Sequence, residues 1–284
     1  MSDRQPPEIA DAAVASGISK VAPPLGKLFV GSFLAGAYIA FGGLVAIAVS
    51  SGLDPQRWGT LPTLFTGSAF ALGLVLVVIA GSHLVTGNMM LVPISAMNGR
   101  IGAKDVAKNL ALVALGNLAG SLFVAYFLAV QTGVIGGPNA TPGTGAALMH
   151  DRLIAIAEAK GVSETAWQIF LRAVGCNWLV CLAVWMSLGA KNISGKILAI
   201  FFPIMAFVAL GFDHVVANMF FLPAAIFAGD PNLGWDDTLR NWLFAFLGNL
   251  VGAVVFVATS YWYLYLRDEE PAGASAPSTT QTSR

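Results

Sequence analysis

Two of the three histidines in this 284-residue chain lie in a pair of similar, mostly apolar stretches. Residues 81–93 read GSHLVTGNMMLVP and residues 211–223 read GFDHVVANMFFLP, with Gly, Val, Asn, Met and Pro at matching places. An ionisable side chain in a membrane-like run is a candidate functional residue, because it is costly to bury there. His214 is the strongest candidate, since Asp213 and Asn218 accompany it and histidine exchanges protons near physiological pH.

The other chemistry-bearing side chains form no catalytic or metal-binding pattern. Cys176 and Cys181 lie in an apolar run without ligand-like spacing to a histidine, which is typical of buried small residues. The chain has no HExxH, no GxSxG and no motif that combines cysteine with histidine. We therefore expect no enzyme, no catalytic residue, no metal site and no cofactor.

The composition predicts an integral membrane protein in a lipid bilayer. Hydrophobic residues make up 56% of the chain and charged residues only 11%, whereas soluble domains carry about 25% charged residues. Fifteen basic and fifteen acidic residues cancel, so no nucleic-acid partner is expected.

Six membrane spans follow from the apolar runs, since one crossing needs about 20 apolar residues. Two longer runs contain the paired stretches near their middles, with glycine before and proline after, which indicates broken helices. We interpret each of these as one span of two half-helices, so spans two and five are broken. The other four spans are residues 28–50, 110–130, 166–188 and 242–266.

The basic residues predict the orientation. With both termini in the cytoplasm, ten Lys and Arg lie inside and four lie outside, which fits the positive-inside rule for a plasma (inner) membrane protein. The outside set is Arg57, Arg152, Lys160 and Arg240. The expected organisation is a cytoplasmic segment with a short amphipathic helix (1–27), a transmembrane domain (28–267) and a disordered cytoplasmic tail (268–284).

A second pair of similar motifs predicts an inverted repeat. Residues 115–120 read LGNLAG and residues 247–252 read LGNLVG, so spans two and three match spans five and six. A three-span half must insert the opposite way up from its copy, as in channels and transporters with inverted 3+3 repeats, here approximately 28–135 and 160–267. The glycines favour close helix packing, and Asn117 and Asn249 favour hydrogen bonds between helices. Half-helix N-termini at the breaks favour a small anion.

At these motifs the chain resembles the formate–nitrite transporter family. The resemblance rests on GSHLVTGNMM, CNWLVCLAVWM (176–186), FPIMAFVALGFDHVVANMF (202–220) and LGNLVGA (247–253), and it runs from about residue 8 to residue 267. It implies an aquaporin-like, all-α membrane protomer with six transmembrane helices. It also implies a homopentamer with one pore per protomer, which passes small monovalent weak-acid anions such as formate, nitrite, hydrosulfide, acetate or lactate.

The resemblance also implies roles for individual residues. His214 would be the central histidine with Thr86 opposite it, and Asn177 and Asn218 would be polar neighbours in the pore. The two apolar constrictions would draw on Phe70, Leu74, Leu84 and Phe207. Lys20 and Lys160 would attract anions, the latter after a one-residue shift in the alignment. The chain departs from the family where it has His83, commonly an acid, and Val85, commonly Phe.

These residues suggest a mechanism and leave one alternative open. A bare anion is costly to move through a dry constriction, so the hypothesis is that passage requires a proton, from His214 or from water that it polarises. The alternative is an aquaporin-like pore for small neutral solutes, which would need a selectivity arginine. The only arginine in a span is Arg172, near one end of span four. The native anion, the net direction of transport and the choice between channel and proton symport stay open.

Overall fold

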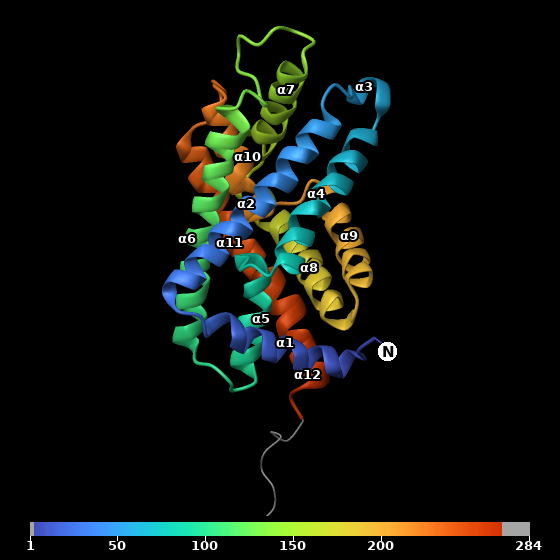
Figure 1. Ribbon diagram of the computed structural model, residues 1–284, viewed down its shortest axis with the longest axis vertical. Helices are drawn as coiled ribbons and strands as arrows, with labels where there is room; N and C mark the ends of the chain where they lie inside the picture. The colour runs from blue at the N-terminus through green and yellow to red at the C-terminus, as the bar shows by residue number, and fades with distance from the viewer. Residues whose placement is uncertain (1–2, 269–284) are drawn as a thin grey trace, which may run out of the picture.

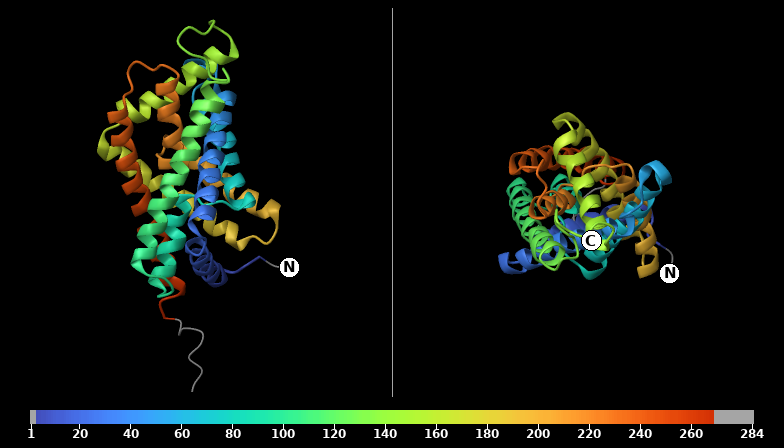
Figure 2. Two further views of the ribbon diagram at one scale, coloured as in Figure 1. Left: turned by 60° about the vertical axis from the view of Figure 1, so that its left-hand side comes forward. Right: turned by 90° about the horizontal axis from the view of Figure 1, so that it is seen from above.

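The computed structural model describes residues 3–268, and every regular element in this part of the chain is a helix (Figure 1). The predicted tail, apart from Asp268, lies outside the described residues. Apolar helices long enough to cross a membrane dominate the fold. They run along the long axis of the molecule (Figure 2).

Four of the six crossings are continuous helices, as predicted. Two of them, α6 and α11, pass near their ends into π-helical segments, in which the hydrogen bonds span five residues. The four crossings are α2 (Leu25–Ser50), α6 (Ala103–Phe123) with η1 (Val124–Val130), α8 (Ala166–Gly189), and α11 (Trp235–Ala253) with η3 (Val254–Thr259) and α12 (Ser260–Tyr265).

The other two crossings are broken in the middle, which confirms the prediction for spans two and five. The second span consists of α4 (Leu61–Ala80) and α5 (Val85–Met97), and the fifth of α9 (Ile193–Ala209) and α10 (Val215–Phe227). Gly81 and Gly211 stand at the two breaks with φ of 80° and 71°. Glycine adopts this left-handed conformation without steric cost, so it ends one half-helix and lets the chain turn.

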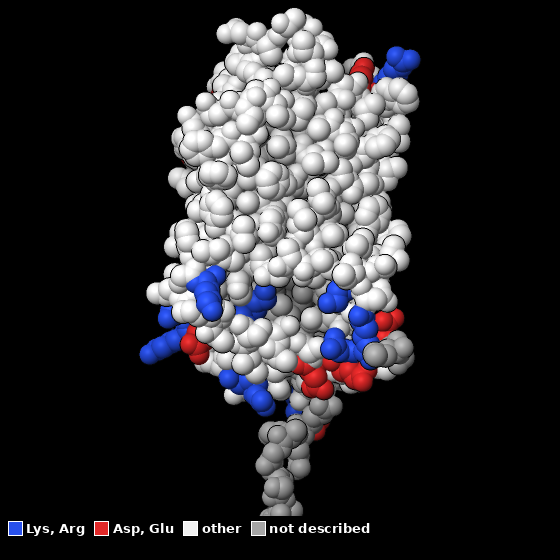
Figure 3. Space-filling model, viewed as in Figure 1, with Lys and Arg blue, Asp and Glu red and all other residues white. Residues whose placement is uncertain are grey.

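The shorter helices cover the two ends of the bundle. Helix α1 (Pro6–Val21) lies across one end, and α3 (Pro55–Trp58) and α7 (Gly145–Glu158), which continues into η2 (Ala159–Ser163), lie at the other (Figure 1). The described chain starts and stops at the α1 end, as an even number of crossings requires. On the face seen in Figure 3 most charged side chains gather at this end, and the middle of the molecule is an uncharged belt.

Two buried asparagines show that the halves are copies. Asn117 accepts a hydrogen bond from the N–H of Val85 (2.8 Å) and donates to the carbonyl oxygens of His83 (2.8 Å) and of α2. Asn249 does the same for Val215 (2.9 Å), for the carbonyl of Asp213 (2.8 Å) and for α8. These bonds confirm the predicted interhelical role of both asparagines. The structural counterpart of His83 is therefore Asp213, and not His214.

The correspondence between the halves also includes the end helices. Asn109 donates to the carbonyl of Lys20 (2.8 Å), and Asn241 donates to the carbonyl of Lys160 (3.1 Å). Each of these asparagines also accepts from an asparagine of the nearby half-helix, at 2.8 Å. Helix α1 in one half thus takes the place of α7 and η2 in the other, and a lysine lies over each break.

The repeated glycines allow close contact between crossings. A Cβ atom at Gly120 would lie 1.9 Å from the carbonyl oxygen of Phe33, and one at Gly252 would lie 2.3 Å from that of Val174. No side chain fits at these distances. The predicted packing role of these glycines is therefore confirmed, and it brings α6 against α2 and α11 against α8.

Candidate functional site

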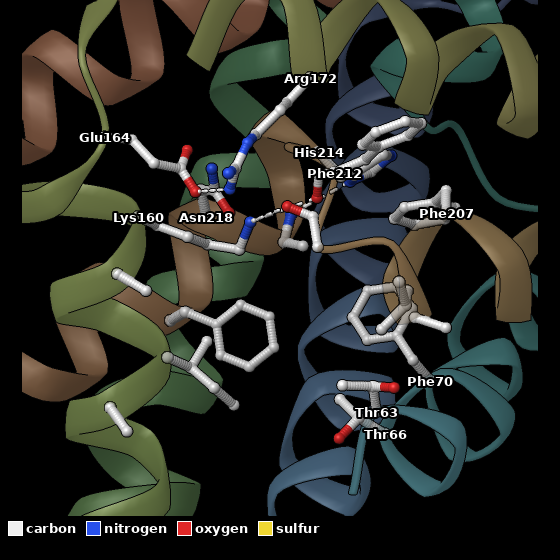
Figure 4. Close-up of a pocket in the computed structure, with 18 of the residues that line it drawn as sticks. Thr63, Thr66, Phe70, Lys160, Glu164, Arg172, Phe207, Phe212, His214 and Asn218 are labelled. Carbon is white, nitrogen blue, oxygen red and sulfur yellow. Dashed lines mark hydrogen bonds and ion pairs between the residues drawn. The ribbon is translucent and has the colours of Figure 1, made fainter. Parts of the chain in front are cut away.

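Two cavities approach the centre of the bundle from opposite ends. The α7-side cavity has a volume of about 220 Å³ and its lining includes Phe70, Arg152, Lys160, Glu164, Phe207 and His214. The α1-side cavity has a volume of about 180 Å³ and its lining includes Lys20, Leu74, Leu84, Gly87, Asn88 and Lys196. Figure 4 shows the α7-side cavity, with the polar cluster around Lys160 above the phenyl ring of Phe70.

One polar pair lies at the centre, where the two breaks meet. The Nε2 atom of His214 lies 2.8 Å from the Oγ1 atom of Thr86, and both side chains are buried. Thr86 belongs to the first turn of α5, and His214 is the N-cap of α10. The structure thus brings together two residues that are 128 positions apart in the sequence.

The contacts of the ring determine which nitrogen of His214 carries the proton. Its Nδ1 atom accepts a hydrogen bond from the backbone N–H of Ala217 at 3.1 Å. A backbone N–H can only donate, so Nδ1 has no proton, and in the neutral ring the proton is on Nε2. Nε2–H therefore donates to Thr86 Oγ1. The hydroxyl hydrogen of Thr86 remains free to point toward a molecule at the centre.

Apolar side chains enclose this pair from both sides. The rings of Phe70 and Phe207 meet edge to face with centroids 5.9 Å apart, and Phe207 stacks on His214 at 5.9 Å. Leu74 and Leu84 line the opposite cavity. Each of these four predicted constriction residues is at most 3% exposed, and no residue lines both cavities.

The two predicted pore asparagines lie in different places. Asn177 lies behind Thr86 and donates to its carbonyl oxygen (3.2 Å) and to that of Asn249 (2.8 Å), so it supports the first turn of α5. Asn218 lines the α7-side cavity and donates to Asp213 Oδ1 at 2.8 Å. Its own Oδ1 atom is buried and has no hydrogen-bond partner in residues 3–268.

The two lysines of the motifs have different surroundings. Lys160 forms an ion pair with Asp213 (3.1 Å) and also donates to the carbonyl oxygens of the break. Lys20 donates to the carbonyl of Ser82 at 2.9 Å and has no carboxylate partner within the described part of the chain. Burial lowers the pKa of the Lys20 ammonium from its ordinary value. His83 lines neither cavity, and its ring is directed toward Gly31 on α2.

Residues that the motifs did not single out also line the α7-side cavity. Arg172 forms an ion pair with Glu164 and its side chain is 41% exposed, so this arginine lies at the mouth and not at the centre. Arg152 reaches the cavity from α7, although the sequence identified it only as one positive charge outside the spans. Arg152 and Lys160 are eight residues apart, which is just over two helical turns. This spacing could have indicated from the sequence that the two side chains share a side of the helix.

The chain is similar to known proteins of a single family. A family model described as Formate/nitrite transporter matches residues 7–263. The chain is 46% identical over 276 residues to a "Probable formate transporter" of Methanothermobacter thermautotrophicus, which covers 94% of this chain and 99% of that protein. A solved "FNT family ion channel" aligns with a TM-score of 0.80 at 32% identity, over 90% of this chain and 98% of that one. A solved "Pentameric formate channel with formate bound" aligns with a TM-score of 0.73 at 30% identity, over 85% and 98%.

Proposed function

We propose, from the premise that this chain belongs to the formate/nitrite transporter family, that it carries small monovalent weak-acid anions, formate or nitrite, through its centre. The observation that carries this proposal is the hydrogen bond between His214 and Thr86, enclosed by apolar side chains between two cavities. A lysine lines each cavity, which suits a solute that arrives with negative charge.

The route follows from the order of the groups. The anion enters a cavity near Lys160 or Lys20 and then meets an apolar layer. A bare anion loses several kcal/mol of hydration in such a layer, whereas a neutral acid does not. The anion therefore gains a proton near the centre, where a new O–H bond forms, and the neutral acid crosses the layer. It releases the proton in the opposite cavity.

The geometry of the central pair favours water as the immediate proton donor. Neutral His214 has no proton on Nδ1, so loss of the Nε2 proton would leave an imidazolate anion. His214 instead donates to Thr86, and the free Thr86 hydroxyl donates to an oxygen of the anion. These two bonds hold the anion while a solvent proton, relayed by a hydronium ion that becomes water again, completes the acid. His214 thus acts through Thr86 in this proposal.

Assembly and location are part of the same proposal. A homopentamer with a pore in each protomer is supported by the similarity of this chain to the solved pentameric formate channel. The basic residues support a plasma (inner) membrane location with both termini in the cytoplasm. We assign a transport role and no catalytic residue.

A pore for small neutral solutes remains the competing function. It would use an arginine as a selectivity filter, but Arg172 is paired with Glu164 at the mouth of the α7-side cavity. The centre itself holds a histidine and a threonine, which favours a solute that exchanges a proton.

One experiment separates the two functions. The purified protein, reconstituted in liposomes, is tested with formate, nitrite, hydrosulfide, lactate and urea at an acidic and at a neutral external pH. We expect faster flux of formate and nitrite at acidic pH, slower flux of lactate and no urea flux. Flux that does not depend on the charge of the solute would refute the anion proposal.

A further inference from the structure

The α7-side cavity contains three cationic side chains, and two of them have carboxylate partners. Lys160 pairs with Asp213, and Arg172 pairs with Glu164. Arg152 also lines the cavity, but no carboxylate of the described residues forms an ion pair with it. Its positive charge is therefore the one available to an incoming anion.

Neutral groups hold the Arg152 guanidinium in place. Its Nε atom donates to Ser50 Oγ at 3.0 Å, and Nη2 donates to Thr66 Oγ1 at 3.1 Å. Both hydroxyls use their own hydrogens on backbone carbonyls one turn earlier, at 2.7 Å, so they act as acceptors toward the arginine. Arg152 of α7 thereby bridges α2 and α4 without losing its charge.

One edge of the guanidinium remains free. Nη1 makes no hydrogen bond within the described part of the chain, and Nη2 has a second N–H beyond the one that meets Thr66. These donors lie in one plane and match the two oxygens of a carboxylate or of nitrite, which a lysine ammonium cannot match in the same way. Thr63, Thr66 and Phe70 line the same cavity.

We propose that Arg152 forms an anion-binding subsite in the α7-side cavity, where the transported weak-acid anion binds before it reaches Phe70 and Phe207. This inference rests on the proposed function and names a residue that captures the substrate. Lys160 lines the same cavity at the break, where Asp213 compensates part of its charge. One uncompensated charge close to the path raises the local anion concentration about three- to tenfold in a partly aqueous cavity.

The test measures formate uptake into proteoliposomes against the concentration of formate on the α7 side. Arg152→Gln keeps a polar side chain near Ser50 and Thr66 but removes the charge. We expect the half-saturating formate concentration to rise about three- to tenfold. Arg152→Lys keeps the charge, and we expect a smaller rise. Arg57→Gln is the matched control, because Arg57 is exposed on α3 at the same end of the molecule, and we expect it to leave uptake unchanged.

The dependence of formate uptake on ionic strength tests the charge of Arg152, because a purely structural role of this residue would not produce such a dependence. An added salt with an impermeant anion screens the charge of Arg152 in the cavity, so wild-type uptake at low formate concentration falls. If Arg152 is the charge that salt screens, uptake by the Arg152→Gln variant should lose most of this salt dependence. A half-saturating concentration and a salt dependence equal to those of the wild type would overturn the subsite.

A cysteine variant tests the charge within one assembled protein. Arg152→Cys is modified from the α7 side with a cationic or an anionic methanethiosulfonate reagent, since Cys176 and Cys181 are both buried. The cationic reagent should lower the half-saturating concentration, and the anionic reagent should raise it. Equal effects of both reagents refute the subsite. Absence of formate flux in the wild type would instead refute the proposed function, so the two failures are distinguishable.

Discussion

Replacement of His214 by asparagine separates proton handling from structure. Asparagine is among the strongest N-cap residues, and its side-chain oxygen can accept the Ala217 N–H that His214 Nδ1 accepts at 3.1 Å. We therefore expect the variant to fold and assemble. It loses the bond from Nε2 to Thr86, the stack on Phe207 and the ability to hold a proton.

The size of the effect follows from the burial of Thr86. Its side chain is fully buried, and a buried hydroxyl without its partner costs about 1–3 kcal/mol. If the bond supports the anion at the top of the barrier, the same amount is added to the barrier. Since about 1.4 kcal/mol is a factor of ten, formate flux at acidic pH should fall roughly five- to hundredfold. Because the proton arrives through water in the proposed route, the flux that remains should still rise at acidic pH.

The assay is uptake of labelled formate into proteoliposomes at acidic and neutral external pH. His83→Asn is the matched control, because it is the same substitution at a histidine that lines neither cavity, and it should keep the wild-type profile. Melting temperatures in detergent show whether each variant is intact. An intact His214→Asn variant with wild-type flux would show that the reasoning about this histidine is wrong.

Four further predictions concern the pore wall, the scaffold, the topology and the assembly. Phe207→Ala should open the apolar layer at its contact with Phe70 and reduce the preference for formate over lactate, measured as relative uptake rates. Gly120→Ala should destabilise the fold by at least about 1–3 kcal/mol, because the added Cβ meets a carbonyl oxygen of α2 at 1.9 Å, whereas Gly26→Ala has open space and should not change the melting temperature. Single cysteines at Gln56 and Lys104, both exposed and at opposite ends of the bundle, should react with an impermeant reagent from opposite sides of the membrane. Native mass spectrometry in mild detergent should give five copies of the chain, and a stable monomer would contradict the pentamer.

Much of the fold could be predicted because the residue types next to each helix break indicate where the break lies. Glycine before and proline after an apolar stretch indicated half-helices, and Gly81 and Gly211 do take the left-handed conformation at the breaks. Asn117 and Asn249 could be assigned to helix contacts because a polar amide in an apolar helix needs a partner. The pairing of Thr86 with His214 came only from the family resemblance, since no local pattern brings two residues 128 positions apart into contact.

Other features needed three-dimensional information. The aligned stretches already place His83 opposite Asp213, but only the structure shows that Asn117 and Asn249 bind the backbone carbonyls of these two residues. Arg152 and Glu164 lie outside the long apolar runs, in a connection whose path over the pore is fixed by tertiary packing. Composition could count their charges but could not place them in a cavity.

The central pair owes its chemistry to the differences between the halves. Because Asp213 is the counterpart of His83, the counterpart of His214 is Leu84, and the counterpart of Thr86 is Val216. Each half therefore contributes one polar side chain to the centre, and its copy contributes an apolar one. Two histidines at the centre would repel each other once protonated, and two apolar residues would leave the anion without a donor. The repeat supplies a symmetric frame of half-helices, and the unequal residues at its breaks place one titratable side chain beside one hydroxyl on the proposed path of the anion.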